Sequence, residues 1–595
     1  MKTRKAVANI RSGWHQFTHN DQVKLSTLAL IIGVGVAYGA LGFRIGIEAI
    51  QSETFGLPLH NGFHLVAQLP WWLVLSVPTL GGLAIGLFVY YVMPDRRPHG
   101  VADVIEAGAL HGGRMDAMTT VKAAALSLGS LGVGASVGRE GPVIHLGAGL
   151  ASWVAHKLHL NPSLSLTLLG CGIASAIGAS FNAPIAGVFF ALEVVIGHYA
   201  LNTFAPIVIA SVAGTVISRI HLGAFPAFVV PAYDIASFFE FPAFILLGLA
   251  CGVAAIVFIR SISLAEDLVK RIDWPIWVRP MVGGALIGGT AIFLPQVLGV
   301  GYAATNAALQ ATLPLWLMLT LIVAKTATTG ISLGSRFGGG VFSPSLFVGA
   351  MVGGSFGVIA GAIFPDLAAS PGFYAMVGMG AVAAPVIGAP ISTILITFEL
   401  TGEFPVVIAA MVAITISTMI SQAVVGRSFF HGQLKRRGIV IRTGRFEQLL
   451  TATHVGDLMT DQYEIIEETA RASEIRHIIE SARYGDFFVI DAQARLVGSI
   501  AFTSLRGVSL DSEFDHLINA RDIARLNPPM LGAGDDLEVA IKVMARHQED
   551  SLPVVNDREA KTVVGILHYK TVLMAYNKAL LRARAEEHDE DTDQP

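Results

Sequence analysis

The sequence contains few charged residues and few cysteines for its length. Only 14% of its 595 residues are Asp, Glu, Lys or Arg, against about a quarter in soluble globular proteins. The two cysteines, Cys171 and Cys251, both lie in apolar runs, so the sequence has neither a disulfide framework nor the spacing of a cysteine metal site. A net charge of −4 without a basic stripe argues against nucleic-acid binding.

The charged residues that are present gather near the C-terminus. Almost half of them lie in the last quarter of the chain, so the first three quarters resemble a membrane protein and the last quarter a soluble one. Lys2, Arg4 and Lys5 precede the first apolar run and favour a cytoplasmic N-terminus. No small-residue cleavage site follows them closely, which argues against a signal peptide.

Apolar runs that could enter or cross a bilayer recur from about residue 25 to residue 425, and a spanning helix needs about 20 apolar residues. The clearest runs are Leu25–Ile50, Trp71–Met93, Phe204–Ile217, Phe244–Ile259, Leu315–Ala327 and Val406–Val425. Three more contain Gly and Pro and are predicted to be broken helices: Ser127–Ala151, Leu164–Ala191 and Ser343–Ile363. Broken helices in lipid surround a cavity or a binding site. The pattern predicts an all-α polytopic membrane protein with a transport site.

Short motifs repeat in the same order in two halves of this region. GREGP at 138–142 has a counterpart in GVFSP at 340–344. Each motif is followed by an Ala-Pro-Ile segment with a glutamate nine residues after its proline, namely Glu193 and Glu399. The order and spacing indicate an internal repeat. The motifs alone leave open whether the halves are parallel or inverted.

The repeated motifs suit an anion site. Unpaired N–H groups and the macrodipole at a helix N-terminus attract an anion without a full counter-charge. Pro142 and Pro344 suit the first turn of a helix, and the glycines before them let the backbone approach closely. Two helix N-termini could therefore face one site. The alternative is that these residues only start and pack helices.

Glu140 is the candidate gate. A carboxylate in apolar membrane sequence is costly and points to function. At a helix N-terminus it would occupy the place of an anion, and protonation would release it. The alternative is a structural ion pair with Arg139 or Arg336.

Four segments carry a resemblance to the CLC family of chloride channels and chloride/proton exchangers: GREGP at 138–142, FNAPIAG at 181–187, GVFSP at 340–344 and FELTG at 398–402. The resemblance covers about 25–435 and implies a homodimer with one pore per subunit and inverted repeats. It implies that Glu140 gates the pore and that the backbone N–H groups of Val341 and Phe342 bind chloride. The anion-binding residues expected from it are Gly138, Arg139, Gly141, Gly340, Val341, Phe342, His99 and Phe430.

Three positions depart from the family's pattern. His99 stands where the family has a serine donor, and it is expected either to replace that donor or simply to line the vestibule. Phe430 stands where the family has a tyrosine, so it narrows the pore without donating a hydrogen bond. Val194 stands where exchangers often carry an inner glutamate, which favours a passive channel over an exchanger. Glu193 and Glu399 are expected to be structural.

The last part of the chain reads as two αβ units that resemble a CBS-domain pair, 451–510 and 518–578, between a membrane domain at 25–435 and an acidic tail at 579–595. Residues 1–24 are expected to be a cytosolic N-terminal segment. An adenine nucleotide could bind between the units. However, Ser504 and Thr571 stand where an Asp would hold the ribose. A packing or dimerising role is an equal expectation, and no cofactor or metal is expected.

Two rival functions are weaker. G-x-S-x-G patterns at 134–138 and 330–334 would suit an intramembrane serine hydrolase, but that site needs a preceding strand, a His and an acid. A membrane sensor that transports nothing would leave the gating glutamate unexplained. The absence of a Walker pattern argues against a pump. The sequence therefore predicts passive chloride passage through a glutamate-gated pore in the plasma (inner) membrane, with both termini cytoplasmic and chloride/proton exchange as the alternative.

Overall fold

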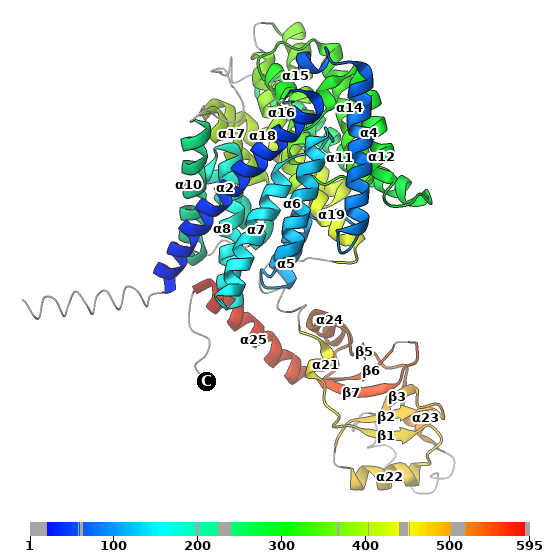
Figure 1. Ribbon diagram of the computed structural model, residues 1–595. Helices are drawn as coiled ribbons and strands as arrows, with labels where there is room; N and C mark the ends of the chain where they lie inside the picture. Colours follow the sequence, from blue (N-terminus) through cyan, green and yellow to red (C-terminus); the bar gives the residue numbers. More distant parts are fainter. Residues whose placement is uncertain are drawn as a thin grey trace, which may run out of the picture. The chain divides into compact units, whose positions relative to one another are not determined.

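The protein is seen here in a computed structural model, and the chain divides into two compact units, Met1–Ile441 and Arg442–Pro595 (Figure 1). The structure describes residues 21–57, 59, 63–197, 201–223, 240–365, 368–402, 404–439, 450, 453–482, 484–500, 518–557 and 559–588. Each unit is described by itself.

The first unit is helical. Its first half comprises α2 (Asp21–Phe55), α3 (Phe63–Val66), α4 (Trp71–Tyr91), α5 (Val101–Leu110), α6 (Ala117–Gly132), α7 (Glu140–Lys157), α8 (Pro162–Phe181), α9 (Pro184–Phe190), a π-helical turn (Ala191–Ile196) and α10 (Leu201–Leu222). Its second half comprises α11 (Phe241–Arg271), α12 (Arg279–Phe293), a short 3₁₀ turn (Pro295–Val297), α13 (Tyr302–Leu309), α14 (Leu315–Gly334), α15 (Phe342–Ile363), α16 (Pro371–Ile387), α17 (Pro390–Thr401), α18 (Phe404–Val425) and α19 (Phe429–Arg436).

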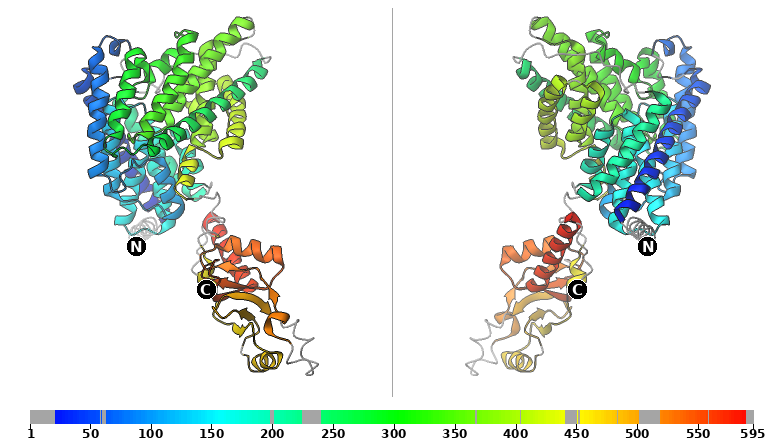
Figure 2. Two further views of the ribbon diagram at one scale, coloured as in Figure 1. Left: turned by 90° about the vertical axis from the view of Figure 1, so that its right-hand side faces the viewer. Right: turned by 90° about the vertical axis from the view of Figure 1, so that its left-hand side faces the viewer.

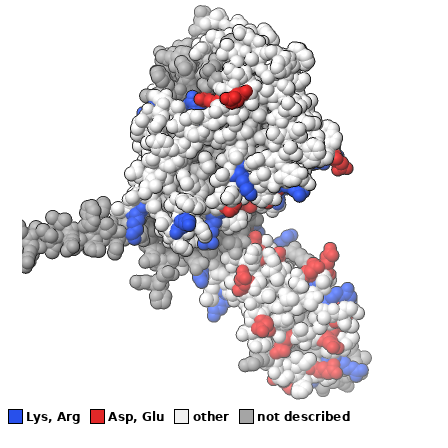
Figure 3. All heavy atoms as spheres, viewed as in Figure 1, with Lys and Arg blue, Asp and Glu red and all other residues white. Residues whose placement is uncertain are grey.

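Eight helices in the described part of the chain are long and apolar enough to cross a membrane. The surface of this unit carries few charged side chains in the view of Figure 3, whereas the second unit shows mixed acidic and basic groups. The prediction of a polytopic helical membrane protein is confirmed. All six of the clearest apolar runs form helices, and most of these helices extend beyond the run that predicted them.

Two of the three predicted helix breaks occur and one does not. The first run is broken between α6 and α7, and the second at Asn182, whose backbone is left-handed (φ 59°). The third prediction is wrong, because α15 runs unbroken from its first turn, where Pro344 fits without cost. The glycines of α15 serve close packing instead. A Cβ at Gly349 would lie 2.3 Å from the carbonyl oxygen of Gly378, and one at Gly353 would lie 2.0 Å from that of Tyr374 on α16.

The sequence repeat is also a repeat of packing. In the first half α2 contacts α8 and α10, and in the second half α11 contacts α16 and α18. Likewise α7 contacts α8, and α15 contacts α16. Equivalent helices then meet across the halves: α4 meets α12 (Figures 1 and 2), and α9 meets α17. The two halves are therefore related by an approximate two-fold axis that passes between them.

The second unit is an α/β unit with two sheets. Its elements are α21 (Val455–Leu458), β1 (Glu464–Glu467), α22 (Ala472–Ser481), β2 (Phe487–Ile490), β3 (Leu496–Ile500), α23 (Ala520–Ile523), β4 (Arg525–Leu526), β5 (Leu531–Gly532), α24 (Leu537–His547), β6 (Ser551–Val555), β7 (Val563–His568) and α25 (Tyr569–His588). In the first sheet β1 pairs in parallel with β2, and β2–β3–β4 are antiparallel. In the second sheet β5 and β6 are parallel, and β6 and β7 are antiparallel.

The two halves of this unit exchange their opening segments. Val455 of α21 packs in the core of the second sheet, with Leu531 and Leu552. Ala520 of α23 packs in the core of the first sheet, with Phe487. The sheets therefore do not follow the division at 510–518 that the sequence suggested. Ser504, most of the N-terminal segment 1–24 and the end of the acidic tail lie outside the described residues.

Candidate functional site

The two signature loops meet in the centre of the first unit. The N–H of Gly138 donates to the carbonyl oxygen of Gly340 at 2.7 Å, and the N–H of Gly340 donates back to Gly138 at 2.8 Å. A Cβ on Gly141 would lie 3.2 Å from the Cα of Gly340, and a Cβ on Gly340 would lie equally close to the Cα of Gly141. Glycine therefore allows the contact, and the contact brings the N-termini of α7 and α15 together.

Glu140 is the first residue of α7, and its side chain is fully buried. Tyr302 Oη donates a hydrogen bond to Glu140 Oε1 at 2.6 Å, and Ser343 Oγ donates to Glu140 Oε2. Ser343 lies in the first turn of α15. The carboxylate thus lies at the N-terminus of the helix from the other repeat, in the position where an anion would be stabilised.

Arg139 pairs with Glu140 on one side. Its Nε lies 3.8 Å from Glu140 Oε1, and its guanidinium stacks 4.9 Å from the centroid of the Tyr302 ring. The predicted alternative of an Arg139–Glu140 ion pair is therefore present, but it coexists with two hydroxyl donors. Arg336 lies elsewhere and donates to the carbonyl oxygen of Arg96.

Two cavities approach Glu140. The tyrosine pocket, of about 280 Å³, is lined by late α2, the end of α8 and the start of α13, including Arg44, Glu48, Arg139, Asn182, Gly301 and Tyr302. The arginine pocket, of about 260 Å³, is lined by the start of α5, late α11 and α19, including His99, Gly141, Lys270, Arg336, Val341 and Phe430. Glu140 lines neither pocket, although its two chain neighbours each line one. Its carboxylate therefore separates the two cavities.

The two pockets are equivalent under the repeat. Late α2 and the start of α13 line the tyrosine pocket, while late α11 and the start of α5 line the arginine pocket. By their order along the two halves, α2 corresponds to α11, and α5 corresponds to α13. An approximate two-fold axis thus exchanges the pockets across Glu140, as inverted halves require.

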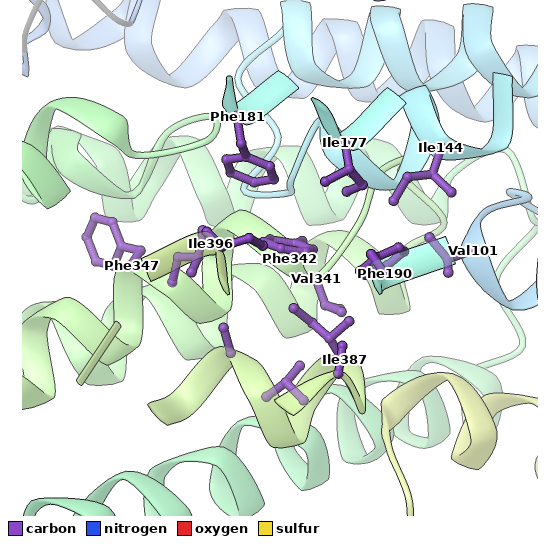
Figure 4. Packing of buried hydrophobic residues seen from close by; sticks show 14 of the residues in the cluster. Val101, Ile144, Ile177, Phe181, Phe190, Val341, Phe342, Phe347, Ile387 and Ile396 are labelled. Atoms are coloured by element: carbon purple, nitrogen blue, oxygen red, sulfur yellow. The ribbon is translucent and has the colours of Figure 1, made fainter. Parts of the chain in front are cut away.

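Three more of the residues predicted to bind the anion lie at the start of α15 or in the wall of the arginine pocket. Val341 precedes α15 and lines the arginine pocket, and Phe342 opens that helix. The Phe342 ring packs 5.0 Å from the ring of Phe181, between side chains from both halves (Figure 4). Phe430 lines the arginine pocket and is 5% exposed, so an aromatic side chain without a hydroxyl borders this pocket.

His99 also lines the arginine pocket, in the loop before α5. Its Nδ1 lies 3.2 Å from Asp103 Oδ1, and its side chain is 9% exposed. Asp103 caps α5 by accepting the N–H of Gly100 at 2.8 Å, and its carboxylate also pairs with Arg97 at 2.7 Å. The Asp103 partner fixes which ring nitrogen of His99 carries a hydrogen.

Val194 lines neither the tyrosine pocket nor the arginine pocket. Its neighbour Glu193 accepts the N–H groups of Ile391 at 3.0 Å and Ser392 at 2.8 Å, at the start of α17. Glu399 caps the equivalent helix, since it accepts the N–H groups of Ile185 and Ala186 at 2.8 Å each. Each glutamate caps a helix of the other half, which is the structural role expected of both.

The serine motifs do not form a hydrolase site. Ser332 lies inside α14, not on a turn after a strand. Ser136 accepts a hydrogen bond from Thr328 Oγ1 at 3.1 Å, and its N–H donates to Ser332 Oγ. Within the residues that the structure describes, neither serine hydrogen-bonds with a histidine or a carboxylate.

Three further residues complete the site and were not predicted. Ser343 belongs to the GVFSP motif, so the sequence does contain a signal for its position. Tyr302 follows a short Gly-rich segment that any turn could contain. Lys325 is fully buried in α14, and its Nζ donates to the carbonyl oxygens of Val297 and Gly299 at 3.0 and 2.7 Å. These bonds hold the turn that presents Tyr302.

Comparisons with known proteins bear on this arrangement. The model of a family described as voltage gated chloride channel matches residues 81–422, and a CBS-domain model matches residues 520–578. A putative chloride channel protein ClcB-like from Ralstonia nicotianae is 35% identical over 392 residues, which cover 65% of this chain and 91% of that protein. The H(+)/Cl(−) exchange transporter ClcA of Vibrio cholerae is 28% identical, over 71% of this chain and 93% of its own. A slow cyanobacterial Cl−/H+ antiporter has a similar fold, with a TM-score of 0.62 at 20% identity, over 69% of this chain and 97% of its own.

Proposed function

Because this chain belongs to the voltage gated chloride channel (CLC) family, we propose that it transports chloride in exchange for protons and that Glu140 couples the two movements. The observation that carries the proposal is the position of the Glu140 carboxylate. It lies fully buried between two cavities, at the N-terminus of α15, with Tyr302 and Ser343 as donors.

The carboxylate and a chloride ion would compete for the same place. Both are anions, and both are stabilised by the same helix N-terminus and the same hydroxyl groups. Chloride can enter only when the carboxylate leaves, and a carboxylate that loses these donors in an apolar interior leaves more easily when it carries a proton. Each chloride passage is thereby linked to a protonation of Glu140.

We therefore propose proton-coupled exchange instead of the passive channel that the sequence favoured. The sequence argument depended on Val194, but that residue lines neither pocket beside Glu140. A neutral side chain there does not remove the protonatable group between the cavities. Relatives of this chain are named as an exchange transporter and an antiporter, although one is named as a putative channel.

The arginine pocket supplies the anion path on one side. Six basic side chains line it against two acidic ones, so it concentrates anions next to Val341. Late α2 lines the tyrosine pocket, far along the helix from its N-terminal end. With a cytoplasmic N-terminus, as the positive-inside tendency predicts, the tyrosine pocket opens outward and the arginine pocket opens to the cytosol.

The testing experiment uses purified protein in liposomes. A chloride gradient is imposed, the reversal potential is recorded and the internal pH is followed. We expect chloride to drive protons uphill in the wild type. Chloride at its Nernst potential without proton movement would instead identify a passive channel.

Two variants locate the coupling group. Glu140→Gln mimics the protonated gate, so we expect chloride flux to persist while proton movement and the pH dependence of flux disappear. The matched control is Glu53→Gln, which neutralises an exposed glutamate of α2 and leaves both unchanged. Unchanged pH dependence in Glu140→Gln contradicts the gating role.

The family resemblance also suggests how the protein assembles and what its C-terminal unit does. We propose a homodimer in the plasma membrane, with a CBS pair that packs or dimerises and does not sense nucleotide. Mass measurement of the detergent-purified protein tests the dimer, and calorimetry with AMP tests the CBS pair. A monomer, or AMP binding at micromolar concentration, would overturn the respective proposal.

A further inference from the structure

A third cavity lies beside the arginine pocket and shares part of its wall. This histidine pocket has a volume of about 260 Å³, which gives room for several water molecules. It is lined by the loop before α5, by α5, by the loop and first turn of α6, and by His145 of α7. Arg97, His99 and Asp103 line both the histidine pocket and the arginine pocket. One side of this shared wall therefore faces the anion path.

The two adjoining cavities carry opposite charge. The charged and titratable side chains that line the histidine pocket are Asp95, Arg97, His99, Asp103, Glu106, His111, Arg114, Asp116 and His145. Four carboxylates there face two guanidinium groups, whereas six basic groups face two carboxylates in the arginine pocket. Chloride is therefore favoured in the arginine pocket and disfavoured in the histidine pocket, while a proton has the opposite preference.

His99 is arranged to accept a proton from this side. Its Nδ1 lies 3.2 Å from Asp103 Oδ1, so this nitrogen carries the hydrogen that the carboxylate accepts. Nε2 then has the free lone pair. It is buried and makes no hydrogen bond among the described residues, and Asp95 Oδ2 lies 3.7 Å away, where it would stabilise the imidazolium. Arg97 and Arg437 both contact Asp103, which keeps that carboxylate charged beside the ring.

His145 lies beside His99 and belongs to the helix that Glu140 begins. Its ring centroid lies 6.2 Å from that of His99, and its side chain is buried in the wall of the histidine pocket. His145 follows Glu140 by five residues on the same helix, a rise of about 7.5 Å along the axis with a rotation of about 140° around it. The two side chains therefore leave α7 on different faces.

We propose that the histidine pocket is the proton entry site on the side of the arginine pocket, with His99 and His145 as the groups that bind a proton and pass it toward Glu140. Chloride uses the arginine pocket, so the two ions arrive at Glu140 from separate cavities. Each transfer moves one proton from an imidazolium to the next acceptor and regenerates the neutral ring. This inference rests on the proposed exchange and gives it a proton route without a carboxylate at Val194.

The test measures coupling, because a merely structural change alters both fluxes together. Full-length protein in liposomes is given a chloride gradient, and chloride and proton movement are recorded in the same sample. We expect His145→Gln to lower proton movement at least tenfold while chloride flux stays within about twofold. His145→Glu returns a titratable group to the position and is expected to restore most of the proton movement. His156→Gln changes an exposed histidine on the same helix and is expected to alter neither flux.

A second variant tests the route in case His145→Gln does not fold. His99→Asn removes the imidazole ring from the loop before α5. Because His99 also lines the arginine pocket, its readout is the ratio of proton to chloride movement, which we expect to fall at least tenfold whatever the change in chloride flux. An unchanged ratio of proton to chloride movement in both neutral variants overturns the histidine route and leaves exchange intact. A proportional loss of both fluxes also overturns the route. A wild type that moves chloride without protons overturns the exchange proposal and this route with it.

Discussion

Tyr302 and Glu140, 162 residues apart, are joined by a 2.6 Å hydrogen bond from the phenol to the carboxylate. The tyrosine begins α13 in the second half and the glutamate begins α7 in the first. The phenol is therefore a donor from one half to a charge on the other. It also lines the tyrosine pocket, so the Glu140 carboxylate is held from the side of that pocket.

Removing this hydroxyl should make the gate easier to open. Tyr302→Phe keeps the ring under Arg139 but deletes a donor to the charged form of Glu140, a bond worth roughly 1.5–3 kcal/mol. Protonation then competes more successfully, so the pH of half-maximal chloride flux should rise by roughly one to two units. Flux measured in liposomes from pH 4 to 8 checks this.

The chain offers a matched control for that variant. Tyr374 Oη donates to Glu240 Oε1 at 3.0 Å, a second buried tyrosine–glutamate pair. Neither residue lines the tyrosine pocket or the arginine pocket. Tyr374→Phe should leave the pH profile in place. Equal shifts in the two variants would mean that the Tyr302 bond has no special part in gating.

Phe430→Tyr should tighten chloride binding. Phe430 lines the arginine pocket, and a hydroxyl on its ring would add one donor near the anion path, worth about 1 kcal/mol or roughly fivefold in affinity. Calorimetric titration with chloride measures the change. Phe429→Tyr is the neighbouring control, because Phe429 lines the same pocket one residue earlier. No gain at Phe430 would place it away from the bound ion.

Glu193→Gln should lower stability without altering coupling. Glu193 accepts two N–H groups and the Ser392 hydroxyl at the start of α17, and an amide provides only one acceptor. The expected loss is about 1–3 kcal/mol, seen as a lower melting temperature in detergent. Glu399→Gln should behave alike, since it caps α9 in the same way. A lost proton flux with an unchanged melting temperature would instead assign Glu193 to the proton route.

Gly340→Ala tests the contact between the signature loops. The added Cβ would lie 3.2 Å from the Cα and N of Gly141, so the loops must separate by a few tenths of an ångström. We expect a loss of about 1–3 kcal/mol and a weakened chloride site. Gly289→Ala is the control, because its Cβ would meet nothing within 4 Å. A melting temperature equal to that of the control would show that the loops are not in tight contact.

The sequence predicted the centre of the site better than its walls. The glycines and prolines in GREGP and GVFSP indicate the local backbone conformation, and they predict the helix N-termini at Glu140 and Phe342. A side chain that reaches across the fold leaves no such local mark, so Tyr302 and His145 were not predicted. The predicted break within α15 was wrong. A glycine that interrupts a helix cannot be distinguished, in a single sequence, from a glycine that lets a neighbouring helix pack closely.

In the C-terminal unit the limit of prediction is different. Each αβ pattern was visible, because the alternation of apolar residues in strands and helices is local. The packing of α21 with the second sheet and of α23 with the first depends on the mutual arrangement of the two sheets. No local pattern records that exchange.

The reciprocal bonds between Gly138 and Gly340 also set an order of events during synthesis. About two hundred residues separate the two glycines, and a ribosome adding about 5–20 residues per second needs roughly 10–40 s to cover them. During that interval the first loop and the Glu140 carboxylate lack the partners that later surround them. In a nascent chain that stops before α15, the Glu140 carboxylate and the backbone groups of the first loop would therefore both lack partners. Such a chain is a substrate for membrane quality control rather than half of a working transporter.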